Sequence, residues 1–217
     1  MRKWILFRLI GIFICAGFIV IIQSLPDSQP YVVLIRALDK EGQVKWSGSG
    51  YFVRSDLILT AGHIVQDTKE FEIVLPSGKI RPAFFEYQED VNLVDVGLIR
   101  IRGDYPVIHF GKSAQLGQDV WIAGYGLGEM PFTLTRGIVS CVDRHISFFG
   151  KLPLLQVDAS AWPGHSGSPV LDNDNYVVGI HVGKHPGDEC WSLNVPVDII
   201  KLVLTKYDAT RALGNTR

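Results

Sequence analysis

The sequence predicts an all-β protein that folds as two small antiparallel barrels, with a helical segment at each end of the chain. Aromatic and β-branched residues are frequent, and 22 glycines and 11 prolines punctuate the 217 residues, which is typical of strands joined by tight turns. Short apolar runs recur between turn residues, and only one stretch after the N-terminal region has helical periodicity. A domain of about 180 residues can bury a sizeable core.

The first 22 residues are predicted to be a targeting or anchoring helix outside the folded domain. Arg2, Lys3 and Arg8 precede an uncharged apolar run that ends at Ile22, which is the pattern of a signal anchor or a signal peptide. No pair of small residues marks a cleavage site, so we favour an uncleaved single-pass membrane anchor with the domain outside the cytoplasm. Cleavage, which would secrete the domain, is the alternative. Residues 23–30 are polar and proline-rich, as expected for a linker.

The folded domain is predicted over residues 31–207, and its first barrel occupies residues 31–103. Apolar runs of strand length alternate there with turns such as Asp39–Gly42 and Pro76–Lys79. The expected strands are residues 31–36, 44–46, 47–53, 57–60, 71–75, 80–87 and 96–102.

The second barrel is predicted over residues 119–196, after a connecting segment at residues 104–118. Its expected strands are residues 120–125, 132–142, 154–158, 168–171, 176–182 and 191–195. Residues 197–207 carry apolar side chains at helical spacing and predict a helix. Residues 208–217 are expected to be a frayed tail.

The loop from Trp162 to Pro169 is the strongest candidate for chemistry. Ser166 stands in it between Gly164 and Gly167, a pattern that favours an exposed hydroxyl and free backbone N–H groups. A serine hydroxyl needs a histidine base and an orienting carboxylate.

Candidates for both partners occur earlier in the chain. His63 in Thr-Ala-Gly-His and Asp95 in Asp-Val-Gly-Leu each stand at the edge of an apolar run. Glu89 and Asp90 are alternative carboxylates, although they lie in a polar turn. We prefer Asp95 because the run that follows it would place it where a strand enters the core.

These three motifs, in this order, resemble the chymotrypsin-like serine peptidases over about Trp46 to Val203, and most closely the high-temperature-requirement proteases and the glutamyl endopeptidases. The resemblance implies two six-stranded antiparallel β-barrels with the active site between them. It implies a serine endopeptidase in which Ser166 forms an acyl-enzyme, His63 is the general base and Asp95 orients it. Backbone N–H groups of Gly164 and Ser166 would form the oxyanion hole. The implied substrate is a protein or peptide, without a metal or an organic cofactor.

Two further histidines bear on this resemblance. His165 replaces the Asp or Asn usual at its position, so we expect no activation through a freshly cut N-terminus. His181, in Gly-Ile-His-Val-Gly, resembles the histidine that lines the specificity pocket of the glutamyl endopeptidases, and so predicts a preference for Glu or Gln before the cut. The candidate pocket residues are Ser160, Ala161, His181, Val182 and Gly183. A small aliphatic preference, as in the high-temperature-requirement proteases, is the alternative. Proteases of that branch usually carry a peptide-binding domain after the final helix; because this sequence stops soon after residue 207, we expect no such domain to regulate it in cis.

Charge and cysteine usage set the remaining limits. With 21 basic and 22 acidic residues the formal net charge is −1, so nothing suggests a nucleic-acid partner. Three cysteines are too few for a dense disulfide scaffold, and Cys141 with Cys190 is the one pair that the folded domain could form. A catalytically silent binding or scaffolding protein on the same fold, or an envelope chaperone, are the alternative functions.

Overall fold

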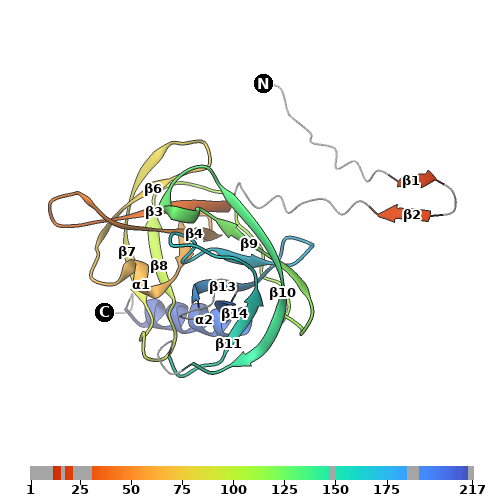
Figure 1. Ribbon diagram of the computed structural model, residues 1–217. Helices are drawn as coiled ribbons and strands as arrows, with labels where there is room; N and C mark the ends of the chain where they lie inside the picture. The colour runs from red at the N-terminus through yellow and green to blue at the C-terminus, as the bar shows by residue number, and fades with distance from the viewer. Residues whose placement is uncertain (1–11, 16–17, 22–30, 147–149, 185–190, 215–217) are drawn as a thin grey trace.

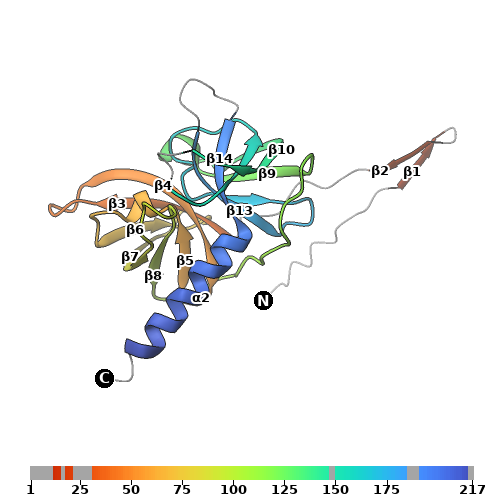
Figure 2. The same cartoon turned by 90° about the horizontal axis from the view of Figure 1, so that it is seen from below.

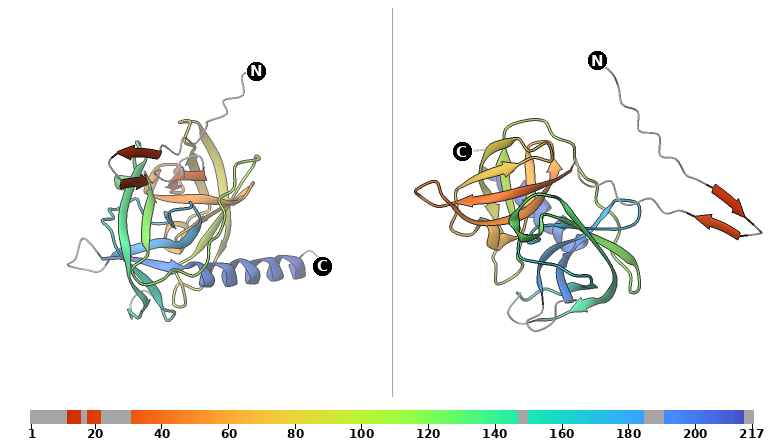
Figure 3. Two further views of the ribbon diagram at one scale, coloured as in Figure 1. Left: turned by 90° about the vertical axis from the view of Figure 1, so that its right-hand side faces the viewer. Right: turned by 45° about the horizontal axis from the view of Figure 1, so that its top comes forward.

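The computed structural model describes residues 12–15, 18–21, 31–146, 150–184 and 191–214. Between Val32 and Pro196 the chain forms two closed six-stranded antiparallel barrels. The barrels lie side by side, and the chain completes the first before it begins the second (Figure 1, Figure 3). The predicted all-β class and the two six-stranded barrels are therefore confirmed.

Barrel one joins its strands in the order β3-β4-β5-β8-β7-β6. They are β3 (Val32–Leu38), β4 (Val44–Arg54), β5 (Leu57–Thr60), β6 (Glu70–Val74), β7 (Ile80–Gln88) and β8 (Gly97–Ile101). The runs predicted separately at residues 44–46 and 47–53 form one strand, β4, which corrects the sequence prediction. Its glycines serve close packing, because a Cβ on Gly50 would lie only 2.6 Å from Ile35 Cδ1.

Barrel two joins its strands in the order β10-β11-β14-β13-β12-β9. They are β9 (Asp119–Gly124), β10 (Thr133–Arg144), β11 (Leu154–Asp158), β12 (Pro169–Leu171), β13 (Val177–Lys184) and β14 (Trp191–Pro196). A short 3-10 turn, η2 (Gly126–Gly128), lies between β9 and β10. Each strand begins within one residue of its predicted start, because turn residues interrupt the apolar runs sharply here.

Helix α2 (Val197–Gly214) continues directly from β14 and runs alongside barrel one (Figure 2). The predicted helix is confirmed, but the predicted frayed tail is wrong for residues 208–214, which are helical. Contacts with barrel one favour the extra turns: Asp208 accepts hydrogen bonds from Arg54 at 2.6 and 2.7 Å. Arg100 of β8 donates a hydrogen bond to the Tyr207 hydroxyl at 2.5 Å. Helix α2 therefore joins the two barrels.

The described part of the N-terminal region is a hairpin of β1 (Ile12–Cys15) and β2 (Phe18–Ile21), which stands apart from the barrels (Figure 1). The predicted helix is wrong for these two strands, whose β-branched residues favour extended backbone. The rest of the predicted segment at residues 1–22, and the linker at residues 23–30, lie outside the described residues. Within the described ranges, no helix combines the length and apolar character needed to span a membrane.

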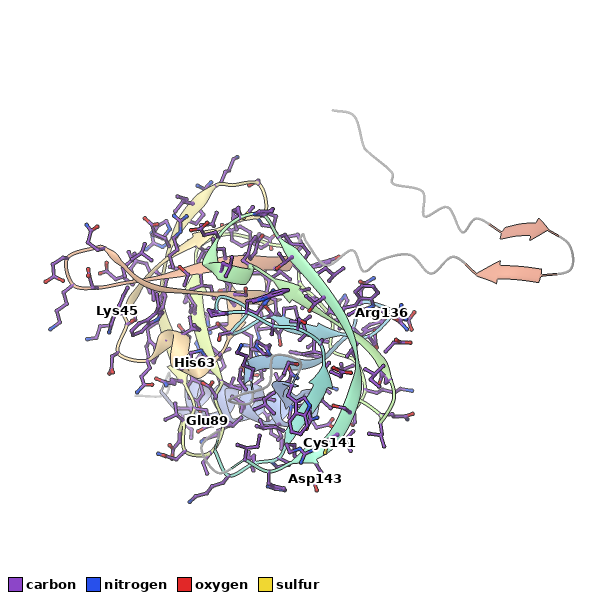
Figure 4. The ribbon with its side chains drawn as sticks, in the orientation of Figure 1. Lys45, His63, Glu89, Arg136, Cys141 and Asp143 are labelled. Atoms are coloured by element: carbon purple, nitrogen blue, oxygen red, sulfur yellow. The ribbon has the colours of Figure 1, made fainter. Side chains whose placement is uncertain are left out.

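The structure describes only one cysteine of the possible Cys141–Cys190 pair. Cys141 lies on β10 as a half-buried free thiol (Figure 4). Cys190 lies outside the described residues. The structure therefore contains no disulfide at Cys141.

Candidate active site

His63 and Asp95 form a close pair on barrel one. His63 lies on the short turn α1 (Gly62–Val65), which follows β5, and it is labelled in Figure 4. Asp95 Oδ2 lies 2.6 Å from His63 Nδ1, and Asp95 Oδ1 accepts the His63 backbone N–H at 2.7 Å. A carboxylate accepts hydrogen bonds, so His63 Nδ1 is the donor to Asp95. In a neutral imidazole with its proton on Nδ1, the lone pair is on Nε2. The His63 side chain is 42% exposed, so this nitrogen can act as a base.

The sequence of α1 makes this close approach possible. Gly62 packs directly against the carboxylate, since a Cβ there would lie 2.8 Å from Asp95 Oδ1. Any larger residue would push the aspartate away from the imidazole. The glycine in the Thr-Ala-Gly-His motif therefore has a steric role in forming the pair.

The two alternative carboxylates are engaged elsewhere. Glu89 is buried and accepts hydrogen bonds from Lys206 at 2.7 Å and from the Tyr87 hydroxyl at 2.9 Å. Asp90 accepts from the backbone and the side chain of Asn92. Neither hydrogen-bonds to His63 in the part of the chain that the structure describes. Of the carboxylates considered from the sequence, Asp95 is the one that contacts the imidazole.

The loop that carries Ser166 is fixed between the two barrels. The Ser49 N–H of β4 donates to the Ser166 carbonyl at 2.7 Å, and the Gly167 N–H donates to the His181 carbonyl of β13 at 2.7 Å. A Cβ on Gly48 would lie close to both Ile64 and the Ser166 carbonyl, at 2.7 and 3.0 Å. Ser166 therefore lies beside α1, although among the described residues no hydrogen bond joins its hydroxyl to His63.

The turn before Ser166 presents two backbone donors. The His165 N–H bonds to the Trp162 carbonyl at 3.0 Å, and Gly164 has a φ of 97°; with Pro163 before it, this is a type II turn. The Pro163 carbonyl accepts the Leu127 N–H at 2.6 Å. Carbonyl and N–H of a trans peptide point in opposite directions, so the Gly164 N–H points away from Leu127. Across the described ranges, neither it nor the Ser166 N–H has an acceptor.

His181 lies next to this loop and is almost fully buried. Its Nδ1 lies 3.2 Å from Asn194 Oδ1, while Asn194 Nδ2 donates to the Leu155 carbonyl at 3.0 Å. That second bond fixes the amide, so Oδ1 accepts from His181 Nδ1 and the neutral Nε2 is an acceptor. Burial, with a smaller contribution from the charge of His165, lowers the pKa of His181 to about 3.

The other predicted pocket residues are less well placed. Ala161 and Val182 are buried in the core of the protein, at 4% and 2% exposure. Ser160 is half-buried, and no hydrogen bond connects it to His181 within the described residues. Gly183 lies at a β-bulge opposite Leu193. His181 is the one member of the predicted set that combines a polar side chain with contact to the nucleophile loop.

Comparison with known proteins agrees with this geometry. Residues 48–180 match the family model described as "Trypsin-like peptidase domain". The chain belongs to the trypsin-like peptidase family.

This trypsin-like peptidase chain also resembles individual proteins. It is 31% identical over 170 residues to the "Probable periplasmic serine endoprotease DegP-like" of Pseudomonas fluorescens, covering 74% of this chain and 35% of that protein. It is 32% identical over 157 residues to "Serine protease Do-like HtrA" of Bacillus subtilis, covering 66% of this chain and 34% of that protein. The chain thus spans about a third of the length of these relatives.

Solved structures share the fold of this peptidase domain. The active form of the Rv3671c protease from M. tuberculosis matches with a TM-score of 0.73 and 22% identity, over 83% of this chain and 82% of that one. The serine endoprotease from Yersinia pestis matches with a TM-score of 0.71 and 22% identity, over 82% of this chain and 63% of that one.

Sequence reasoning missed three residues that shape the site in this peptidase domain. Asn194 orients His181, Thr133 contacts the His165 ring, and Ser49 connects β4 to the nucleophile loop. Only Asn194 carries a usable signal, because it is a polar residue inside the apolar run of β14. Thr133 and Ser49 look like ordinary strand and turn residues, and their partners lie far away in sequence.

Proposed function

We propose that this chain is a serine endopeptidase that acts through an acyl-enzyme. The observation that carries the proposal is the Asp95–His63 pair, with both carboxylate oxygens engaged, beside a serine loop with two N–H groups that have no acceptor among the described residues. In this mechanism His63 Nε2 takes the proton from Ser166 Oγ as the oxygen attacks the peptide carbonyl. Catalytic hydrogen bonds are often long in free enzymes and tighten with substrate, so the missing Ser166–His63 bond is compatible with this step.

The remaining groups have complementary roles. Asp95 holds the proton of His63 on Nδ1 and stabilises the imidazolium, while the Gly164 and Ser166 N–H groups receive the negative charge of the tetrahedral oxygen. The imidazolium then protonates the leaving amine, and Ser166 is left as an ester. Water, deprotonated by His63, attacks that ester and releases Ser166.

Labelling with a fluorophosphonate probe tests this function. We expect the wild-type protein to be labelled and Ser166→Ala to be unlabelled, because the probe reacts only with an activated serine. Ser168→Ala is the matched control: its hydroxyl lies two residues away, is buried and has no hydrogen-bond partner among the described residues, so labelling should match wild type. A folded wild-type protein that is never labelled would instead support the silent binding protein.

We further propose that His181 selects the residue before the cut. A neutral imidazole whose Nδ1–H is held by Asn194 offers a lone pair on Nε2, which suits the amide of glutamine better than the carboxylate of glutamate. At neutral pH we therefore expect peptide-library profiling to show Gln preferred over Glu, with His181→Ala losing this preference. Cuts mainly after Val or Ala would contradict this role, and cuts after Arg or Lys would contradict the pocket assignment as a whole.

We also propose an extracytoplasmic location for the domain. The relatives named as periplasmic support it, as does the cationic and apolar N-terminal sequence. In the bacterial setting of these relatives, an alkaline phosphatase fusion after residue 217 should be active if the domain is exported. An inactive fusion of normal abundance would contradict this location.

A further inference from the structure

We propose that His165 is a positioning residue, whose neutral ring joins the turn bearing the Gly164 N–H to Thr133 of β10 and so holds that N–H in place as an oxyanion donor. The proposal rests on the endopeptidase function proposed above. Position 165 holds a histidine and not an aspartate. The proposal therefore assigns the holding of the Gly164 N–H to hydrogen bonds between His165 and Thr133.

The hydrogen bonds around the ring determine its tautomer. The Trp162 backbone N–H donates to His165 Nδ1 at 3.0 Å, so Nδ1 is the acceptor and the single proton of a neutral ring is on Nε2. His165 Nε2 lies 2.8 Å from Thr133 Oγ1 and donates to it. Both ring nitrogens of this fully buried residue are therefore satisfied.

Thr133 completes the network without leaving a donor or acceptor over. Its hydroxyl donates its one proton to the Gly124 carbonyl at 3.0 Å. Its oxygen accepts the Gly126 N–H at 3.1 Å as well as the His165 Nε2–H. A hydroxyl has one proton and two lone pairs, so every position is used. A fully satisfied network around a buried imidazole specifies one arrangement of its members, here with Thr133 half-buried.

The network encloses the peptide bond between Pro163 and Gly164. On one side, His165 closes the turn twice, through its N–H to the Trp162 carbonyl and through Nδ1 to the Trp162 N–H. On the other side, the loop that Thr133 holds approaches Gly164 so closely that a Cβ there would lie 2.2 Å from the Gly128 nitrogen. Reversal of the Gly164 peptide would require both sides to move.

The surroundings keep the ring neutral. Burial lowers the pKa of His165 to about 4. Among the described residues, the titratable group that faces it is His181 on β13, which carries no positive charge at neutral pH because its own pKa is lowered. Gly126 of η2, Thr133 of β10 and the Trp162 ring, 5.6 Å from the imidazole, carry no charge. If the ring were protonated, its Nδ1–H would face the Trp162 N–H, so two donors would repel each other and the turn would open.

Substitution of Thr133 tests the proposal with a matched control on the same strand. Thr133→Val keeps the shape but removes the acceptor of the His165 proton, whereas Thr135→Val removes a buried hydroxyl that has no partner in the described part of the chain. We expect Thr133→Val to slow the maximal rate of fluorophosphonate labelling about tenfold or more, a fraction of the loss for a missing oxyanion donor. The probe concentration for half-maximal rate should stay unchanged, Thr135→Val should behave like wild type, and Thr133→Ser should restore the rate.

Histidine 15N NMR of the full chain supplies a readout that does not depend on activity. We expect the His165 ring to be neutral with its proton on Nε2 at pH 5.5, where an ordinary imidazole is protonated, and to lose this state in Thr133→Val. A proton on Nδ1, or a wild-type labelling rate in a folded Thr133→Val, would overturn the proposal. If wild type is not labelled at all, the endopeptidase function fails, while the NMR result still decides the ring arrangement.

Discussion

Three histidines lie near one another at the junction of the barrels, and their partners give them different properties. His63 faces a carboxylate and is partly exposed, which suits proton transfer. His165 and His181 are buried and face backbone, hydroxyl and amide groups. Desolvation disfavours their charged forms, so they act as neutral hydrogen-bonding groups. The same residue type thus has a different chemistry at each position because of its immediate neighbours.

The two buried histidines predict a loss of stability in mild acid. Their folded pKa values are about 4 and about 3, against about 6.5 when exposed in the unfolded chain. At pH values between the folded and the unfolded pKa, the unfolded chain binds protons that the folded chain does not. The unfolded state is therefore increasingly favoured as the pH falls below about 6.5. We expect the free energy of unfolding to drop by roughly 3 to 4 kcal/mol from pH 7 to pH 5.

Urea unfolding at pH 7 and pH 5 measures this difference. Glu86 and Glu89 have lowered pKa values and titrate mainly below this range, so histidines dominate the change. His145→Gln should leave the difference intact, because that side chain is 64% exposed. Equal stability at the two pH values would show that His165 and His181 are not buried as neutral groups.

At the scale of elements, the sequence predicts the strands well where turn residues bound an apolar run. β5 and β11 have their predicted limits, since a turn or loop interrupts the run at both ends. The helix α2 extends beyond its apolar pattern because ion pairs with barrel one stabilise its later turns, and such tertiary contacts cannot be inferred from periodicity. The N-terminal run shows the opposite failure, because hydrophobicity alone does not separate helix from strand.

Helix α2 also supports the segment that carries Asp95. The Glu89 N–H bonds to the Val96 carbonyl across this segment, and the Glu89 carboxylate binds Lys206 of α2. Burial raises the pKa of the Glu89 carboxyl, but hydrogen bonds from Lys206, the Asp90 N–H and Tyr87 outweigh it and hold this pKa below its ordinary value. Glu89 is therefore a buried anion that depends on its donors.

We expect Glu89→Gln to destabilise the fold by about 1 to 3 kcal/mol, because it leaves buried hydrogen-bonding groups mismatched. It should also slow fluorophosphonate labelling, since a neutral amide holds Lys206 of α2 more weakly than the carboxylate does and so loosens the attachment of the Asp95 segment. Asp208→Asn is the matched control, because it breaks the exposed pair with Arg54, which is worth less than about 1 kcal/mol. Equal stability and labelling in the two variants, compared by urea unfolding and labelling kinetics, would contradict the role of α2.

At the scale of the whole molecule, the candidate site is divided between the barrels: His63 and Asp95 belong to the first and Ser166 to the second. The sequence indicates these three residues because each stands in a short motif with local steric requirements. It does not indicate which contacts fix the position of barrel one relative to barrel two, because those contacts join residues distant in the chain. The Ser49 hydroxyl, for example, donates to the Gly164 carbonyl at 2.8 Å and accepts the Tyr125 N–H at 2.9 Å.

Two buried serines, one in each barrel, allow the alignment of the two barrels to be tested. Both are fully buried, but Ser49 Oγ satisfies two backbone groups, whereas Ser168 Oγ has no partner within the ranges that the structure describes. Ser49→Ala leaves the Gly164 carbonyl and the Tyr125 N–H without that hydroxyl, so we expect a loss of about 1 to 3 kcal/mol in urea unfolding and slower fluorophosphonate labelling. Ser168→Ala removes an unpaired hydroxyl and should be neutral or slightly stabilising. If both substitutions gave the same small effect, the Ser49 bridge would not set the alignment, and packing between the barrels would have to do so alone.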